Sequence, residues 1–133
     1  MITLDTSALD RLIRDLASLQ GDVGELTQAT RAGGELVRFD GRNYPPPPAG
    51  STYTRTYVLR DGWADVEVDT SPGRIEADIY NTVDYAEFVY GPAQAAVHSG
   101  RWPTDAALVD ENEAEILMLI EQGADAWLRG AGL

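Results

Sequence analysis

His98 is the only histidine in the chain, and it stands beside Arg101 and Trp102 in the segment Ala95–Trp102. A histidine near an arginine could act as a general base, but a lone histidine in a loop more often serves as a structural hydrogen-bonding group. The chain has no cysteine and none of the GxSxG, HExxH, Walker or GxGxxG patterns on which nucleophilic, zinc and nucleotide chemistry depend. We therefore expect no catalytic residue, no enzymatic activity and no cofactor.

Carboxylate pairs are the other groups that could do chemistry. Asp84 and Glu87 are three residues apart, and a solvated helical turn explains that spacing. The acidic residues of the run 110–115 are explained by helix capping and by the helix dipole. This run, DENEAE, also lacks the alternating ligands and central glycine of an EF-hand. The sequence therefore predicts no metal site.

Length and composition indicate one soluble domain. A chain of 133 residues with 44% apolar residues can bury a core of its own. No apolar run approaches the roughly 20 residues that a membrane-spanning helix needs. The first ten residues have no basic segment followed by an apolar stretch, which argues against a signal peptide. Without cysteine, neither disulfides nor thiolate zinc sites can stabilise the fold.

The net charge of -12 is unevenly distributed along the chain. Residues 1–60 carry seven arginines and seven acidic residues, whereas residues 61–133 carry three arginines and fifteen acidic residues. An acidic surface does not bind nucleic acid through its phosphates, because that requires cationic groups. The charge either keeps the protein soluble, which is the commoner reason, or lines a surface that repels DNA.

A β-hairpin is the clearest structural signal. Apolar and acidic residues alternate in Trp63–Asp69 and again in Arg74–Asn81, and the turn residues 71–73 separate the two runs. We therefore expect two antiparallel strands with one apolar and one acidic face. Because an isolated hairpin is only marginally stable, it needs further strands, from this chain or from a neighbour.

Helical patterns flank this hairpin. Thr6 and Ser7 are suitable N-caps, and apolar residues then recur at helical spacing as far as Phe39. A helix of about 30 residues would be roughly 45 Å long, longer than the domain itself, so part of it should project or bend. Near the other end of the chain, Thr104 or Asp105 could start a closing helix, and Asp110 is the preferred cap. Its apolar run at 116–120 is covered on more than one side, which suggests contact with another subunit.

The predicted fold class is α+β: a long N-terminal helix, a small antiparallel sheet built on the hairpin, a short helical turn, and a C-terminal helix packed on the sheet. The four consecutive prolines Pro45–Pro48 exclude a helix or central strand there and favour a stiff extended loop. This loop is either a rigid connector or a partner-docking segment. The predicted parts of the single domain 1–133 are a helical arm (1–40), a Pro-rich loop (41–62), the hairpin and helical turn (63–91), a second loop (92–104) and the C-terminal helix (105–130).

Three segments resemble a known family of viral proteins. They are Tyr44–Trp63 (YPPPPAGSTYTRTYVLRDGW), Ile79–Gly91 (IYNTVDYAEFVYG) and Ala95–Trp102 (AAVHSGRW). Together with the order of the elements, they are similar to the minor tail, neck and tail-completion proteins of tailed bacteriophages and prophages, the HK97 gp10-like family. The resemblance is strong over 44–102 and rests on pattern alone in both helices. Its most specific positions are Tyr53, Arg55, Thr56, Asn81, Tyr85, Ala86, Val89, Gly91, His98, Gly100, Arg101 and Trp102. The family commonly has glycine at the position of Tyr57.

The resemblance implies a structural virion protein, assembled in the bacterial cytoplasm, that forms a ring, expected to be a hexamer, at the head-tail junction or the tail end. Its implied partners are copies of itself, connector or adaptor proteins, and tail tube or terminator proteins; DNA would pass without specific binding, and no membrane is involved. The expected interface residues are Tyr44, Pro46, Tyr53, Arg55, Tyr57, Tyr85, His98, Arg101 and Trp102. An acidic sheet face turned to the ring lumen, which would keep DNA from sticking, comprises Asp65, Glu67, Asp69, Glu76 and Asp78.

Two other functions stay open. The charge asymmetry also fits an acidic protein-binding module or a DNA-mimic inhibitor, which would bind a basic protein tightly at low salt as a monomer or dimer. A small enzyme that uses His98 is the other alternative, and it predicts that His98→Ala abolishes activity while the fold stays intact.

Overall fold

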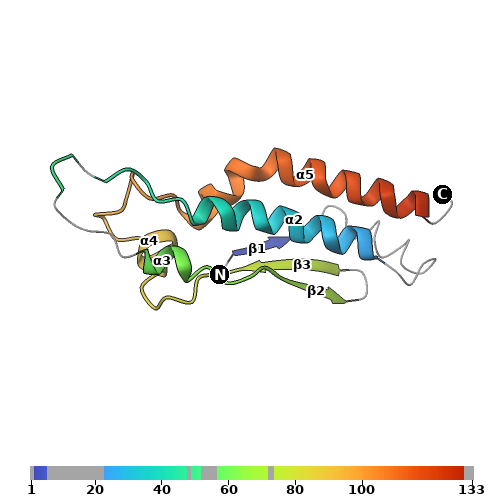
Figure 1. Ribbon diagram of the computed structural model, residues 1–133, viewed down its shortest axis with the longest axis horizontal. Helices are drawn as coiled ribbons and strands as arrows, with labels where there is room; N and C mark the ends of the chain where they lie inside the picture. The colour runs from blue at the N-terminus through green and yellow to red at the C-terminus, as the bar shows by residue number, and fades with distance from the viewer. Residues whose placement is uncertain (1, 6–22, 48, 52–56, 72–73, 131–133) are drawn as a thin grey trace.

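The computed structural model describes residues 2–5, 23–47, 49–51, 57–71 and 74–130. Figure 1 shows an elongated molecule in which two long helices run beside a small sheet, with the loops gathered at one end. The elements in chain order are β1 (Ile2–Asp5), α2 (Gly24–Gly41), α3 (Val58–Asp61), β2 (Glu67–Ser71), β3 (Arg74–Ile79), α4 (Glu87–Tyr90) and α5 (Asp105–Gly130).

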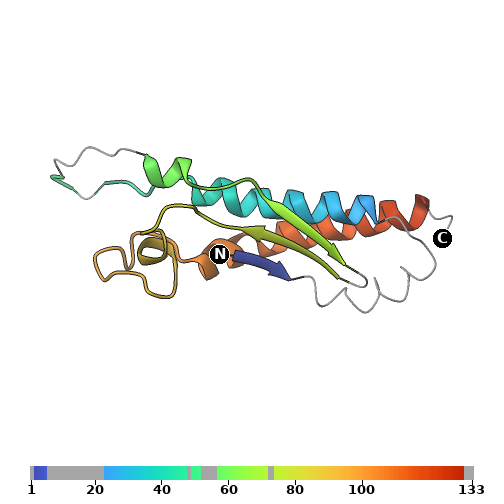
Figure 2. The ribbon, with the colours of Figure 1, turned by 90° about the horizontal axis from the view of Figure 1, so that it is seen from below.

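The sheet has three antiparallel strands in the order β1-β3-β2. The hairpin is formed by β2 and β3, with Val68 opposite Ala77 and Thr70 opposite Ile75. In β3, side chains alternate between buried and half-buried, because every second residue faces the helices. Helices on one side of a small antiparallel sheet make this an α+β fold, as the sequence predicts, and Figure 2 shows the sheet in front of the two helices.

The third strand comes from the start of the chain, so the prediction of a helical arm over 1–40 is wrong at residues 2–5. Ile2 pairs with Ile79 and is 6% exposed, and its burial extends the apolar face of the hairpin at the free side of β3. A strand of four residues gives too short an alternation to be recognised beside the helical periodicity of the residues that follow it. The predicted N-caps Thr6 and Ser7 lie outside the described residues.

The helix α2 does not continue an unbroken helix from the N-terminus. Val23, the residue before it, has φ -119° and ψ 28°, which is not helical, and α2 ends at Gly41 rather than at Phe39. This helix lies along α5 instead of projecting from the domain (Figure 1). On the side of the sheet, Gly34 lets α2 pack closely on the segment leading into β2, because a Cβ at this position would lie 2.8 Å from a methyl carbon of Val66.

The C-terminal helix α5 covers Asp105–Gly130, the range that the sequence predicts. Its cap is Thr104, whose hydroxyl accepts a hydrogen bond from the amide of Ala107 at 3.2 Å. The alternative start at Thr104 or Asp105 is therefore confirmed, and the preferred cap, Asp110, is wrong. The helix packs on the sheet through side chains that share one core cluster with Ile79; these are Leu108, Ile116 and Ile120. Within the apolar run, Leu117 and Met118 are about half exposed.

The strand β2 begins four residues later than predicted, and arginines of α2 bind carbonyl groups of the segment before it. Arg31 donates from Nη1 to the carbonyl of Val66 at 2.6 Å, and Arg38 donates from Nη2 to that of Trp63 at 3.3 Å. Trp63 keeps a single isolated bridge to the sheet. The segment before β2 is thus held between the sheet and α2.

Two short helices complete the fold. The predicted loop over 41–62 contains α3, which begins directly after Tyr57. The predicted helical turn is present as α4, and Tyr90 folds back into the core, whereas Tyr85 and Phe88 remain about half exposed. None of the helices in the described residues is long and apolar enough to cross a membrane.

Candidate functional site

An aromatic cluster joins the Pro-rich loop to the second loop. Its rings form a chain of contacts between successive centroids: Tyr57 to Tyr44 at 5.1 Å, Tyr44 to Trp102 at 4.9 Å, Trp102 to Tyr90 at 5.7 Å and Tyr90 to Trp63 at 5.1 Å. The first contact is stacked and the others are edge-to-face, the geometries that aromatic quadrupoles favour. The cluster therefore runs from the exposed Tyr57 to the buried Trp63.

Hydrogen bonds and charge fix both ends of this aromatic cluster. The hydroxyl of Tyr44 accepts a hydrogen bond from the amide of Arg60 at 3.2 Å, and the guanidinium of Arg60 lies 4.7 Å from the ring centre of Tyr57. At the buried end, the hydroxyl of Tyr90 donates to the carbonyl of Gly41 at 2.8 Å. Burial raises the pKa of Tyr90, so this hydroxyl stays protonated and continues to donate.

Tyr57 adopts a backbone conformation that is unusual for a residue with a side chain. Its φ of 59° and ψ of 16° lie in the left-handed region, and it is the one non-glycine residue with positive φ in the part of the chain that the structure describes. Glycine adopts this region without steric cost, whereas an L side chain does not. The backbone just before α3 therefore has the shape that a glycine would favour.

The second loop brings His98 and Trp102 together. Their ring centres are 6.1 Å apart in an edge-to-face arrangement, and the amide of Trp102 donates to the carbonyl of His98 at 2.9 Å. Gln94 closes the loop by donating from Nε2 to the carbonyls of Val89 and Trp102, at 2.7 and 3.0 Å. No described carboxylate is hydrogen-bonded to His98, and its Nδ1 is buried without a partner among the described residues.

The structure brings only some of the expected interface residues together. Four of them lie in or against the aromatic cluster: Tyr44, Tyr57, His98 and Trp102. Arg101 is half-buried in the same loop, Pro46 is exposed in the Pro-rich loop, and Tyr85 is exposed in the turn before α4, outside the ring contacts. Tyr53 and Arg55 lie outside the described residues.

Four of the five acidic residues predicted for one sheet face lie on the two paired strands, whereas Asp65 lies in the segment before β2, where its Oδ1 is 3.4 Å from Nη2 of Arg38 on α2. In the register of β2 and β3, Glu67 lies opposite Asp78 and Asp69 opposite Glu76. Asp65, Glu67 and Asp69 are exposed, while Glu76 and Asp78 are half-buried. Like charges directly opposite each other destabilise a sheet, so this acidic sheet face has an energetic cost.

Several partners reduce that cost. Glu76 is paired with Arg74, and the hydroxyl of Thr3 donates to Asp78 at 3.0 Å. Tyr80 donates a hydrogen bond from its hydroxyl to Glu67 at 3.0 Å, and this bond raises the pKa of Tyr80.

No group of histidine and acidic side chains among the described residues is arranged to hold a metal ion.

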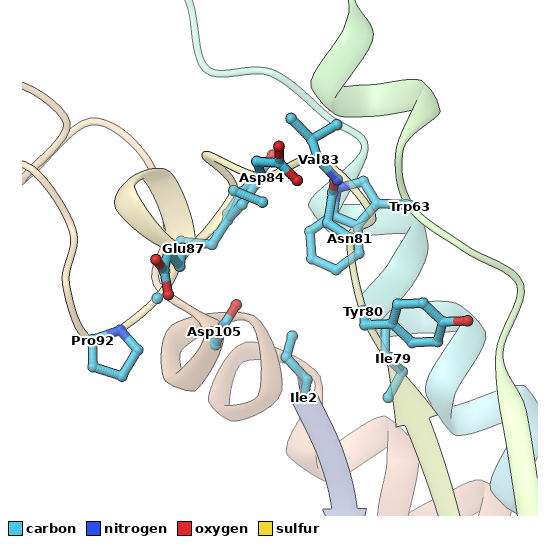
Figure 3. Close-up of a pocket in the computed structure, with 13 residues that line it drawn as sticks. Ile2, Trp63, Ile79, Tyr80, Asn81, Val83, Asp84, Glu87, Pro92 and Asp105 are labelled. Carbon is cyan, nitrogen blue, oxygen red and sulfur yellow. The ribbon is translucent and has the colours of Figure 1, made fainter.

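A pocket of about 380 Å³ opens beside α4. Its floor contains Ile2 and Ile79, and its rim carries Asp84, Glu87 and Asp105 (Figure 3). Partial burial raises the pKa of Asp105. The sequence indicated only a solvated turn at Asp84 and Glu87. It gave no sign of the pocket, because Asp105 and Ile2 are distant in the chain and meet only through the fold.

Searches of protein-family models, of curated proteins and of solved structures found no match to this chain.

Proposed function

We propose that this chain is a structural protein of a tailed bacteriophage or prophage particle. In this proposal it forms a ring, expected to be a hexamer, at the head-tail junction or the tail end, where it joins or completes the tail and lets DNA pass. The observation that carries the proposal is the aromatic cluster, in which the segments that resemble the family, Tyr44–Trp63 and Ala95–Trp102, meet in one set of ring contacts. Residues that define a family's fold are expected to converge in this way.

The backbone at Tyr57 supports the same proposal. Proteins of the resembled family commonly have glycine at this position, and here the residue has a φ of 59°, where glycine has no steric penalty. The backbone conformation that a glycine would favour is therefore present here, although this chain has tyrosine at the position. A chance likeness of sequence would not be expected to coincide with this conformation.

Exposed apolar side chains support assembly into a ring. Leu117 and Met118 on α5, and Phe39 on α2, are between 48% and 67% exposed. The strands β1 and β2 form the two edges of the sheet. Surfaces of this kind are suited to contacts between subunits, although single exposed apolar residues are common on any protein.

The location of the protein in a particle tests this function directly. Purified particles of the source phage, labelled with an antibody against this chain, should carry the label at the neck or at the tail end. Absence of the chain from the proteins of the purified particle would refute the proposal. Size-exclusion chromatography with light scattering adds the oligomeric state, but a monomer in solution is compatible with a ring that forms only on the growing particle.

Within the ring, we propose that the acidic sheet face lines the lumen and keeps DNA from adhering during passage. The opposed carboxylates of Glu67 and Asp78, and of Asp69 and Glu76, support this orientation, because a surface that only needs solubility has no reason to place like charges opposite each other on one sheet. A reconstruction of the assembled ring with these carboxylates on its outer surface would contradict this orientation but not the role in the particle.

The acidic sheet face also favours a second candidate, an acidic protein-binding module or a DNA-mimic inhibitor. Such a module would bind a basic nucleic-acid-binding protein at low salt and release it as the salt concentration rises. It would do so as a monomer or dimer and would be absent from particles. The labelling experiment therefore separates the two functions.

A further inference from the structure

Acidic residues are absent from the two loops that meet in the aromatic cluster. Residues 41–60 and 92–104 contain four arginines and the only histidine, but no aspartate or glutamate. The rest of the chain contains six arginines and all 22 acidic residues. Tyr44 and Trp102 bring the two loops into contact, and Figure 1 and Figure 2 both show the loops at the same end of the elongated molecule. The fold therefore separates a basic end from an acidic body.

Two of the arginines at this end have no internal partner. Asp61, which directly follows the first acid-free segment, pairs with Arg60 at 2.8 Å. The guanidinium groups of Arg42 and Arg101 form no hydrogen bond or ion pair with any residue that the structure describes. The hydrogen bond from Arg60, and to a smaller extent the charge of Arg42, lowers the pKa of Asp61, so Arg42 lies in the same region. Arg42 and Arg101 can therefore pair with carboxylates of another molecule.

Exposed apolar side chains accompany these two arginines. Tyr57, Val58 and Val97 are 42%, 50% and 67% exposed. They adjoin the aromatic cluster, because Tyr57 belongs to it and Val97 precedes His98, which contacts Trp102. Arginine and aromatic side chains are enriched at protein interfaces. We name this surface the loop tip; it consists of Arg42, Tyr57, Val58, Val97 and Arg101.

The outer side of helix α5 has the complementary character. Exposed residues follow one another there at intervals of three or four positions, which places them on one side of the helix. Three of them carry carboxylates that form no hydrogen bond or ion pair with any described residue, and the fourth, Leu117, is 50% exposed. We name this surface the α5 stripe; it consists of Asp110, Glu113, Leu117 and Glu121.

The loop tip does not pair with the α5 stripe of its own molecule. None of the ion pairs between described residues joins the two surfaces. Leu117 lies about 18 Å along the helix axis from Asp105, the first residue of α5, at a rise of about 1.5 Å per residue. An acidic partner for the loop tip must therefore come from another molecule.

We propose that the loop tip binds the α5 stripe of a second copy of this chain. Arg42 and Arg101 pair with carboxylates of the stripe, while Val97 packs near Leu117. Charge complementarity selects this partner, since the two surfaces are opposite in charge and both expose apolar side chains. The inference rests on the proposed function, because it names the contact that joins the copies in the ring.

This contact joins two different surfaces, so a pair of copies still presents one free loop tip and one free α5 stripe. Further copies can add in the same way, and a ring forms if the rotation between successive copies closes. The net charge of -12 does not prevent the contact. At physiological salt the Debye length is about 8 Å, so repulsion between the more distant acidic groups is largely screened.

The absence of cysteine from the chain allows this contact to be trapped by a disulfide. Two single-cysteine proteins are prepared, Ala96→Cys beside Val97 and Ala114→Cys in the α5 stripe, both at exposed positions. One of them carries an affinity tag, so that the mixed dimer separates from both symmetric dimers on a non-reducing gel. The control partner for Ala96→Cys is Thr70→Cys, at an exposed position on β2.

We expect the mixed disulfide of Ala96→Cys with Ala114→Cys to form at least about tenfold faster than that with Thr70→Cys, because binding raises the effective concentration of the thiols. Equal rates with the two partners would overturn the proposal.

Reversed charges test whether the named side chains make the contact. Arg42→Glu/Arg101→Glu, introduced into the first cysteine protein, should slow the mixed disulfide about tenfold, because like charges then face each other. Glu113→Arg/Glu121→Arg, introduced into the second cysteine protein, should restore the rate, which a merely misfolded variant would not allow. A matched control, Glu111→Arg/Glu115→Arg, makes the same change at exposed positions on another side of α5 and should leave the rate slow. Equal restoration by both pairs, or by neither, would overturn the proposal.

Nucleic acid is another acidic molecule that arginines and aromatic rings bind. Fluorescence anisotropy of a labelled single-stranded oligonucleotide is therefore measured with the unmodified protein and with Arg42→Glu/Arg101→Glu. We expect no binding that depends on these two arginines. Binding by the unmodified protein that this variant loses would show that the loop tip binds nucleic acid, and the proposal would fail.

The labelling of phage particles tests the proposed function separately from this contact. The mixed disulfide in a protein that is absent from particles would refute the function and support the contact between copies. Labelled particles without the mixed disulfide would refute the contact and leave the function standing.

Discussion

At the scale of single residues, Tyr57 combines an unfavourable backbone with favourable ring contacts. Replacing it by alanine or by glycine removes the same contacts with Tyr44 and Arg60, but only glycine relieves the left-handed conformation. We expect Tyr57→Gly to be more stable than Tyr57→Ala by about 1 kcal/mol in the free energy of unfolding. Urea denaturation of the two variants measures this difference. Equal stability of the two would mean that the backbone before α3 is not held at positive φ.

Asp105 gives the protein a pH dependence of a defined sign. Because desolvation raises its pKa in the folded state above 3.8, its contribution to stability is greatest below pH 3.8 and is lost as the pH rises through the raised value. Asp105→Asn removes this dependence. We therefore expect the variant to gain stability relative to the unmodified protein as the pH increases.

Urea denaturation at several pH values measures this gain. The exposed Asp110→Asn on the same helix is the control, and it should change with pH less than Asp105→Asn does. A difference between Asp105→Asn and the unmodified protein that stays constant with pH would contradict the desolvation of this carboxylate.

At the scale of elements, the contact between α2 and α5 depends on Gly123. A Cβ there would lie 2.5 Å from the Cβ of Ala29, a distance that forces the helices apart. An alanine gains about 1 kcal/mol of helix propensity, but overpacking costs about 1 to 3 kcal/mol. We expect Gly123→Ala to lower the free energy of unfolding by about 1 kcal/mol, measured by urea denaturation.

The exposed neighbour Gln122→Ala is the control for helix propensity, and its effect should lie within about 0.5 kcal/mol. A gain of about 1 kcal/mol in Gly123→Ala would indicate that the helices separate freely at this point, as for a glycine on an exposed helix surface.

Local sequence patterns predicted the elements whose structure depends on residues that are close together in the sequence. The hairpin and α5 were predicted because alternation and helical periodicity are local signals. The strand β1 was not, since Ile2 becomes part of a sheet only through pairing with Ile79 at the far side of the fold. The sequence pattern also does not show that Gly34 serves close packing of α2 on the segment before β2.

The candidate sites likewise differ in how far the sequence predicted them. The acidic sheet face follows from alternation within β2 and β3, so the sequence predicted its four members on these strands, whereas Asp65 lies in the segment before β2. Three members of the aromatic cluster, Tyr44, Tyr57 and Trp102, were named only as expected interface residues, and the contact of Tyr44 with Trp102 required the fold. The pocket was missed entirely, because its rim combines α4 with Asp105 of α5. The sequence therefore predicted a face formed by two neighbouring strands, but it did not predict sites formed between elements that are distant in the chain.

At the scale of the whole molecule, the opposed carboxylates make stability depend on salt. Asp69 faces Glu76 across the sheet in a chain of net charge -12. Asp69→Asn should therefore raise the free energy of unfolding by about 0.5 kcal/mol at low salt. At 1 M salt the Debye length falls to about 3 Å, so the gain should largely disappear. Urea denaturation at the two salt concentrations measures both values.

A control with the same change in net charge separates the sheet from the general charge of the molecule. Glu121→Gln removes one negative charge from an exposed position on α5, away from the acidic sheet face. If repulsion across the sheet is the cause, Asp69→Asn gains more than Glu121→Gln at low salt, and the two converge at high salt. Equal gains at low salt would mean that the acidic sheet face carries no special electrostatic cost, and the argument that a functional requirement maintains it would lose its basis.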